Sequence, residues 1–265
     1  MSGFLTMLYE LPTSAIVVGL LAITLAANEL GYRYGLRRQG RESELSKTVS
    51  NSLKGSVFAL VALLLAFSFS GTTNRFDLRQ RLVLDQANAV GTCYLRAGLL
   101  DEPARSEIRD ILRRYVDIRL EHFRAGFQSS LGEKLQLDID QLMRNLWGQI
   151  ESASDANPEA IRTSLIVPAA NEVIDLTSTR AWANRNHLPE PVLVLLLVSV
   201  VISSLLLGHS SGQAASRHPG LWLSSNLVLA LVVYVVLDLD RPKRGFIQID
   251  QAPLVELQQS FQQLP

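Results

Sequence analysis

The stretch that decides the fold is residues 52–71, SLKGSVFALVALLLAFSFSG, in which Lys54 is the one charged side chain. A run of about 20 apolar residues crosses the roughly 30 Å of hydrocarbon in a bilayer as a helix. Three further apolar stretches extend over residues 11–30, 190–208 and 221–238. Four such stretches, with Val, Leu and Ile on every face, are hard to reconcile with core helices of a soluble protein. The sequence therefore predicts an all-α integral membrane protein with four transmembrane helices in two pairs.

The composition agrees with this fold class and argues against several kinds of partner. The 265 residues are 48% hydrophobic, and their mean hydropathy of +0.17 is high for a soluble domain. The formal net charge is zero, so no basic field gathers phosphates and we expect no nucleic-acid partner. Cys93 is the single cysteine, which excludes an internal disulfide and a thiolate metal cluster. We expect neither a metal nor a cofactor.

The segment between the second and third spans, residues 72–189, is predicted to be a helical soluble region. Its first helix carries apolar or small residues at helical spacing, at Val83, Ala87, Val90, Gly91, Tyr94 and Leu95. Asp101-Glu102-Pro103 is typical of a helix start, and Pro168 is expected to bend a later helix. Because each helix has one apolar stripe to bury, we expect a helical bundle.

The tail, residues 239–265, is predicted to be extended over Phe246–Asp250 and then helical. Apolar residues recur there at helical spacing, at Leu254, Leu257, Phe261 and Leu264. Such a short amphipathic helix docks on the bundle or lies on the membrane.

The orientation in the membrane is left open by the charges. The two short loops carry Arg33, Arg37, Arg38, Arg41, Lys47 and Arg217. The opposite side carries Arg75, Arg79, Arg81, Arg180, Arg185, Arg241, Lys243 and Arg244 close to the spans. Short loops weigh most in the positive-inside rule and favour the first group as cytoplasmic, whereas residues near the span ends favour the second group.

The pattern of reactive residues does not indicate an enzyme. The four histidines, His122, His187, His209 and His218, have no metal-ligand spacing, and neither a phosphate-binding loop nor a dinucleotide fingerprint is present. A catalytic site is therefore not expected.

Two groups of polar or small residues attract attention instead. The first is a set of charges of both signs at the membrane boundary, formed by Arg75, Asp77, Asp238, Asp240 and Arg241. It is either a clamp between helices or the rim of an ion pathway, because a charge at this depth needs a partner or water. The second group is Ala87, Asn88 and Gly91, where the small pair Ala87 and Gly91 permits close helix approach, which indicates a packing seam.

Several motifs resemble the bacterial bestrophin-like membrane proteins, and more weakly the bestrophin anion channels. The residues that carry the resemblance are Leu65–Ser70 with Arg75–Asp77, Ala87–Thr92 with Leu95–Ala97, Asn171–Asp175, Arg185–Pro189 and Asp238–Gly245. One position departs from the bestrophin-like pattern: Gln86 stands where the family commonly has glutamate.

The resemblance implies a pentameric anion channel whose second spans line a narrow apolar neck. On residues 52–71, Leu60, Leu64 and Phe67 or Ser68 share a helix face and are the candidate pore-lining residues; simple helix packing explains the same stripe equally well. The resemblance also implies a cytoplasmic soluble region and a multi-pass protein of the cell (inner) membrane.

Two hypotheses of different classes follow. In the first, the chain is a subunit of a homo-oligomeric ion channel in the lipid bilayer, and inorganic ions, with anions as the implied class, are its ligands. In the second, the chain is a non-conducting structural or signal-coupling membrane protein, whose helices relay changes between the bilayer and the soluble region. A channel requires an oligomer with a continuous lumen, whereas a coupling protein requires neither.

Overall fold

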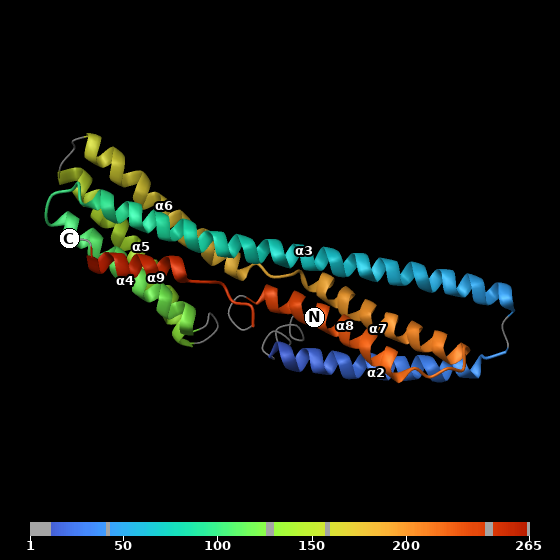
Figure 1. Ribbon diagram of the computed structural model, residues 1–265. Coiled ribbons are helices and arrows are strands. Elements are labelled where there is room, and N and C mark those ends of the chain that lie inside the picture. The colour runs from blue at the N-terminus through green and yellow to red at the C-terminus, as the bar shows by residue number, and fades with distance from the viewer. Residues whose placement is uncertain (1–11, 41–42, 126–129, 157–159, 242–245, 264–265) are drawn as a thin grey trace. The chain divides into compact units, whose positions relative to one another are not determined.

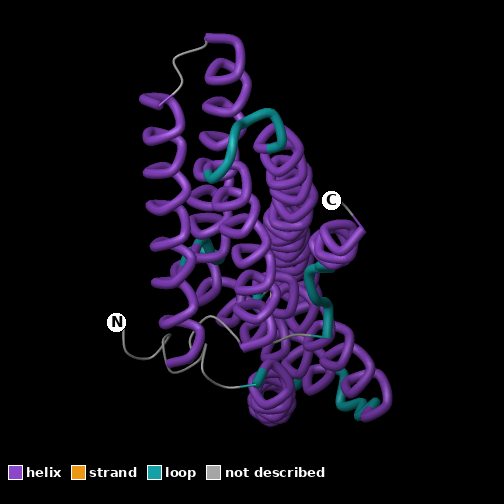
Figure 2. Tube along the Cα trace, turned by 90° about the vertical axis from the view of Figure 1, so that its left-hand side faces the viewer, coloured by secondary structure: helices purple, strands orange, loops and turns teal. Residues whose placement is uncertain are grey.

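A computed structural model describes residues 12–40, 43–125, 130–156, 160–241 and 246–263. Every regular element in these ranges is an α-helix, as Figures 1 and 2 show. The helices are α2 Thr13–Arg37, α3 Glu44–Ala97, α4 Ala104–Ala125, α5 Ser130–Ala156, α6 Ala160–Arg185, α7 Glu190–Gln213, α8 Pro219–Asp240 and α9 Ala252–Gln263. The predicted all-helical class is confirmed.

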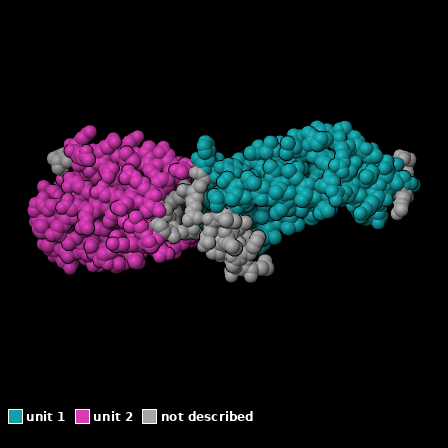
Figure 3. All heavy atoms as spheres, turned by 90° about the horizontal axis from the view of Figure 1, so that it is seen from below, with its two compact units in different colours: residues 1–74, 187–247 teal, residues 75–186, 248–265 magenta. Residues whose placement is uncertain are grey.

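The chain forms two compact units, each built from two separate stretches of sequence (Figure 3). Unit 1 consists of residues 1–74 and 187–247, and unit 2 of residues 75–186 and 248–265. The 54 residues of α3 run without a break from the first unit into the second.

Unit 1 contains the apolar helices. Four helical stretches are long and apolar enough to cross a membrane, namely Thr13–Arg37, Leu45–Ala97, Ser164–Gln213, which includes α7, and Pro219–Asp240. The helices of unit 1 share one core, formed by Ile16 and Leu20 of α2, Val61 and Leu65 of α3, Leu188 before α7, Leu193, Leu196 and Val200 of α7, and Val233, Val236 and Leu237 of α8. Large apolar side chains on their other faces are exposed, as lipid contact requires.

Four glycines bring α2 and α7 into backbone contact. A Cβ atom added at Gly31 would lie 2.9 Å from the backbone nitrogen of His209, and one at Gly212 would lie 2.8 Å from that of Leu36. Gly35 and Gly208 are equally crowded by the backbone of the facing helix. The glycines are four residues apart on each helix, which is the spacing that small residues take where membrane helices pack closely. We call this contact the glycine seam.

Unit 2 is a helical bundle with its own core. Large buried side chains come from α3 (Tyr94), α4 (Ile108, Leu112, Tyr115), α5 (Ile139, Leu146) and α9 (Leu254). The ring of Phe261 stacks on that of Tyr94, with their centroids 4.4 Å apart. The short C-terminal helix therefore docks on the bundle, which was one of the two predicted outcomes.

Most local predictions in unit 2 agree with the structure, with one correction. Val83, Ala87, Val90 and Tyr94 are buried as predicted, but Leu95 is exposed, because it lies about 100° further round the helix than Tyr94. Pro168 lies inside α6, a single helix from Ala160 to Arg185, and the bend expected at this residue stays a prediction.

The junction before α4 has the expected helix-start chemistry. The Glu102 carboxylate accepts hydrogen bonds from the backbone N–H of Ser106 (3.3 Å) and from its hydroxyl (2.7 Å). The hydroxyl is the main cause of a lowered pKa of Glu102. Residues 246–251 are not helical, and the extended conformation expected for Phe246–Asp250 stays a prediction, while Leu264 lies outside the described residues.

Candidate functional site: the outer face of α3

Three large apolar side chains stand in a row on the outside of α3 within unit 1. Leu60 is 65% exposed, Leu63 is 50% exposed and Phe67 is 67% exposed. They lie on one side of the helix because successive members are three or four residues apart. On the opposite side, Val61 and Leu65 are buried in the core of unit 1. We call Leu60, Leu63 and Phe67 the outer face of α3.

The structure separates the four candidate pore-lining residues into two pairs. Leu60 and Phe67 belong to the outer face, whereas Leu64 packs half-buried against the core and Ser68 is only 3% exposed. The Ser68 hydroxyl has no hydrogen-bond partner in the part of the chain that the structure describes. Leu63, which the sequence reasoning did not select, takes the place between Leu60 and Phe67.

Uncharged polar residues flank the outer face. Ser56 is exposed one turn before Leu60, and Ser70 and Asn74 are exposed within two turns after Phe67. No charged residue occurs between Lys54 and Arg75. At 1.5 Å per residue, the distance from Leu60 to Phe67 is about 10 Å. The outer face is thus a short apolar band with polar residues at both ends.

The charged residues at the end of α8 fasten separate parts of unit 1 together. Asp240 accepts a hydrogen bond from the backbone N–H of Leu188 (2.9 Å), and its other carboxylate oxygen is 3.4 Å from Nδ1 of His187. Asp238 accepts from the backbone N–H of Ile247 (2.8 Å). Arg241 donates to the hydroxyl of Thr13 at the start of α2 (3.4 Å).

This geometry favours a clamp over the rim of an ion pathway. Asp238, Asp240 and Arg241 are all buried, so they are not available to a passing ion. The other two members of the predicted set, Arg75 and Asp77, belong to unit 2, where Arg75 is half-buried and Asp77 is exposed.

The predicted packing seam lies on α3 in unit 2 and is in part internal to the chain. A Cβ atom added at Gly91 would be 3.3 Å from a methyl carbon of Leu257 on α9. Ala87 belongs to the core of unit 2, and Asn88 is exposed. Gly91 thus makes room for α9, and Asn88 remains available on the surface.

A buried polar network around Gln86 crosses the core of unit 2. The Gln86 amide donates to the hydroxyls of Thr177 (3.1 Å) and Tyr115, and these two hydroxyls are 2.7 Å apart. Arg180 donates to the Gln86 carbonyl oxygen. The network links α3, α4 and α6. From the sequence, Gln86 is noted only as a departure from the family pattern. Its contacts are not predicted, because no local sequence pattern indicates them.

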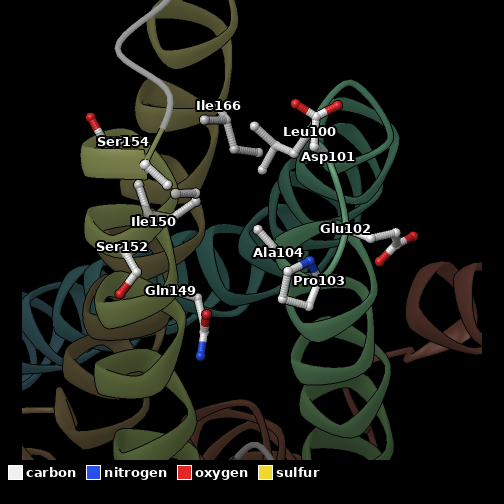
Figure 4. Close-up of a pocket in the computed structure, with 12 residues that line it drawn as sticks. Leu100, Asp101, Glu102, Pro103, Ala104, Gln149, Ile150, Ser152, Ser154 and Ile166 are labelled. Atoms are coloured by element: carbon white, nitrogen blue, oxygen red, sulfur yellow. The ribbon is translucent and has the colours of Figure 1, made fainter.

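A pocket between α4, α5 and α6 offers no reactive chemistry. Its volume is about 260 Å³, and apolar residues such as Leu100, Ala104, Ile150 and Ile166 line it. Figure 4 shows the carboxylates of Asp101 and Glu102 directed away from its interior. Among the residues that the structure describes, no group of three histidine, cysteine or acidic side chains is placed to hold a metal ion.

Comparisons with known proteins identify a family and a shared fold. The Bestrophin-like domain matches residues 15–254. A crystal structure of a bacterial bestrophin homologue from Klebsiella pneumoniae, phased with zinc, superposes with a TM-score of 0.67 at 13% identity, covering 93% of this chain and 96% of that one. A mutant of that homologue gives a TM-score of 0.69 at 12% identity over 93% and 98% of the two chains.

At these identities, the structural likeness shows a shared fold. No curated protein matches the sequence. The domain match covers most of the residues, and four helices are apolar and long enough to span a bilayer. The chain is a membrane protein of the Bestrophin-like domain family.

Proposed function

We propose that the chain is one subunit of a homo-oligomeric ion channel, in which copies of the outer face of α3 surround a narrow apolar neck. The observation that carries the proposal is the exposure of Leu60, Leu63 and Phe67 in one row on the single chain. The polar residues Ser56, Ser70 and Asn74 at both ends of the row fit water-filled openings above and below the neck.

In a neck of this kind, ions pass only when water fills the apolar constriction. Water leaves a narrow apolar constriction readily, and a small ion then has to shed its hydration shell to pass. The band carries no charge between Lys54 and Arg75, so the barrier depends on side-chain size and polarity. The resemblance to bestrophins supports anions as the permeating ions. The exposed charges of α3 after the span do not favour one sign of ion, because both acidic and basic residues occur there, such as Asp77 and Arg81.

The test is ion flux from liposomes that contain the purified protein. Phe67→Ala and Leu60→Ser widen or wet the neck, so each is expected to raise the flux by roughly tenfold, which corresponds to a barrier lowered by about 1.4 kcal/mol. The matched control is Leu195→Ser on α7, because Leu195 is 54% exposed outside the outer face. It is expected to leave the flux unchanged.

The stoichiometry is measured on the same preparation by light scattering or native mass spectrometry. An oligomer of more than two subunits with flux that responds to Phe67 and Leu60 supports the channel. Equal responses of Leu60→Ser and Leu195→Ser refute the assignment of the neck. A monomer or dimer whose liposomes stay silent refutes the channel itself.

The second candidate function is signal coupling without conduction. The continuous helix α3, Glu44–Ala97, favours it, because a rigid helix that leaves the membrane transmits a rotation or shift at one end to the other. The result that supports this candidate is a silent dimer. We also place unit 2 in the cytoplasm, which a fluorescent protein fused after residue 265 tests, because it fluoresces only on that side.

A further inference from the structure

Two arginines are buried in unit 2 without a carboxylate partner. Arg119 of α4 is 4% exposed, and Arg180 of α6 is 8% exposed. Every ion pair that the described residues make involves other side chains. A buried charge is costly unless an opposite charge and hydrogen bonds compensate it.

The contacts of Arg180 are all with neutral groups. One guanidinium nitrogen donates to the Gln86 carbonyl oxygen, and another donates to that of Gln251 at 3.3 Å. The Gln86 amide is in turn held by Tyr115 and Thr177. The network therefore orients the guanidinium of Arg180 and leaves its charge without compensation.

Arg119 is held even more loosely. Its guanidinium carbon is 6.0 Å from the centre of the Tyr115 ring, and it makes no hydrogen bond to any residue in the described ranges. Burial, and after it the charge of Arg119, lower the pKa of Arg180 to about 9. Arg180 is still protonated at neutral pH, so two positive charges act on each other in the core.

We propose that Arg119 and Arg180 together bind one small monovalent anion of the halide class. The free N–H groups of Arg119 supply donors, and the two guanidinium groups supply the charge. Tyr115 and Gln86 beside them are fully buried, so an ion held between the two guanidinium groups is shielded from bulk water. A halide also sheds its water at lower cost than a phosphate, because its single charge is weakly hydrated.

The site is a structural counter-ion site and is independent of the proposed conduction. It links α4 to α6 and completes a core that the chain alone leaves positively charged. The full-length protein in detergent therefore gains stability from chloride at constant ionic strength, with gluconate as the replacement anion, which is too bulky for the site. Saturating chloride is expected to raise the melting temperature by about 5–10 °C.

Three variants make the test specific. Gln86→Glu places a carboxylate beside Arg180 in nearly the same volume. The variant is therefore expected to have a high melting temperature in gluconate and no further increase in chloride. Arg119→Gln removes the unpaired donor and is also expected to lose the response. Arg114→Gln on the exposed side of α4 is the matched control and keeps it.

A second measurement locates the ion. Crystals grown in bromide are expected to show an anomalous peak between the two guanidinium groups in the wild type and none in Gln86→Glu. The proposal is overturned if the wild-type melting temperature follows ionic strength alone, if Arg119→Gln and Arg114→Gln respond alike, or if the peak is absent. If Arg119→Gln does not fold, Gln86→Glu and the bromide map still decide.

Discussion

The glycine seam allows the sharpest prediction, which concerns Gly208→Ala. The added Cβ atom would lie 2.7 Å from the carbonyl carbon of Asn28 on α2, and its oxygen is closer still. The distance from the added Cβ atom to this carbonyl carbon is about 0.7 Å shorter than the 3.4 Å at which ordinary van der Waals contact begins. Because the obstacle is helix backbone, no side-chain rotation relieves it, and α2 and α7 must move apart.

The cost follows from this rigidity. Overpacking a core usually lowers the free energy of unfolding by 1–3 kcal/mol. Because the obstacle at Gly208 is backbone, we expect Gly208→Ala to cost about 3 kcal/mol. Parting the helices also loosens the contacts at Gly31, Gly35 and Gly212. For a chain of this size, the melting temperature is expected to fall by about 6–12 °C.

The assay is thermal unfolding of the protein in detergent, followed by intrinsic fluorescence. Gly19→Ala is the matched control, since it makes the same change on α2 at a position with no atom within 4 Å of the added Cβ. Alanine favours the helix over glycine by about 1 kcal/mol, so this control melts at or slightly above the wild-type temperature. If Gly208→Ala has the same melting temperature as Gly19→Ala, the glycine seam does not hold the helices together and the reasoning is wrong.

Three further predictions concern buried polar groups and a buried thiol. Asn28→Leu is expected to raise the free energy of unfolding by about 1–3 kcal/mol, because the amide of Asn28 is fully buried with no partner among the described residues; a lower melting temperature would contradict this. Asp240→Ala is expected to lower the free energy of unfolding by about 2–3 kcal/mol, because the N–H of Leu188 loses its acceptor. Asp240→Asn keeps an acceptor oxygen, so denaturation curves should show most of the stability regained. Burial raises the pKa of Cys93 to about 12, so a maleimide at pH 8 should label the thiol only after unfolding, and rapid labelling of the native protein would refute its burial.

The spans and the helical class could be predicted from the sequence, because long apolar runs and helical spacing are local signals. The outer face of α3 could be predicted only in part. Leu63, Leu64 and Ser68 lie on an all-apolar or small stretch where no polar side chain marks the exposed side. Which of them is buried depends on where α7 and α8 pack, which the sequence of α3 does not contain.

The glycine seam had a visible signal that the sequence reasoning overlooked. Gly31 and Gly35, like Gly208 and Gly212, are four residues apart, which is the spacing of closely packed membrane helices. The network of Gln86 and Arg180 had no such signal, since its two residues are 94 positions apart in the chain. Long-range polar pairs of this kind are created by the packing of three helices and are not visible in any local pattern.

The discontinuous build of unit 2 has a consequence for biosynthesis. Leu254 and Phe261 of α9 complete its core, yet α9 follows the last apolar helix, α8, in the chain. During translation, α4, α5 and α6 leave the ribosome with part of their apolar surface uncovered, and they stay so until α7 and α8 have been inserted. The soluble bundle therefore reaches its final form only after membrane integration, and a stalled or truncated nascent chain would present a sticky surface to chaperones and proteases.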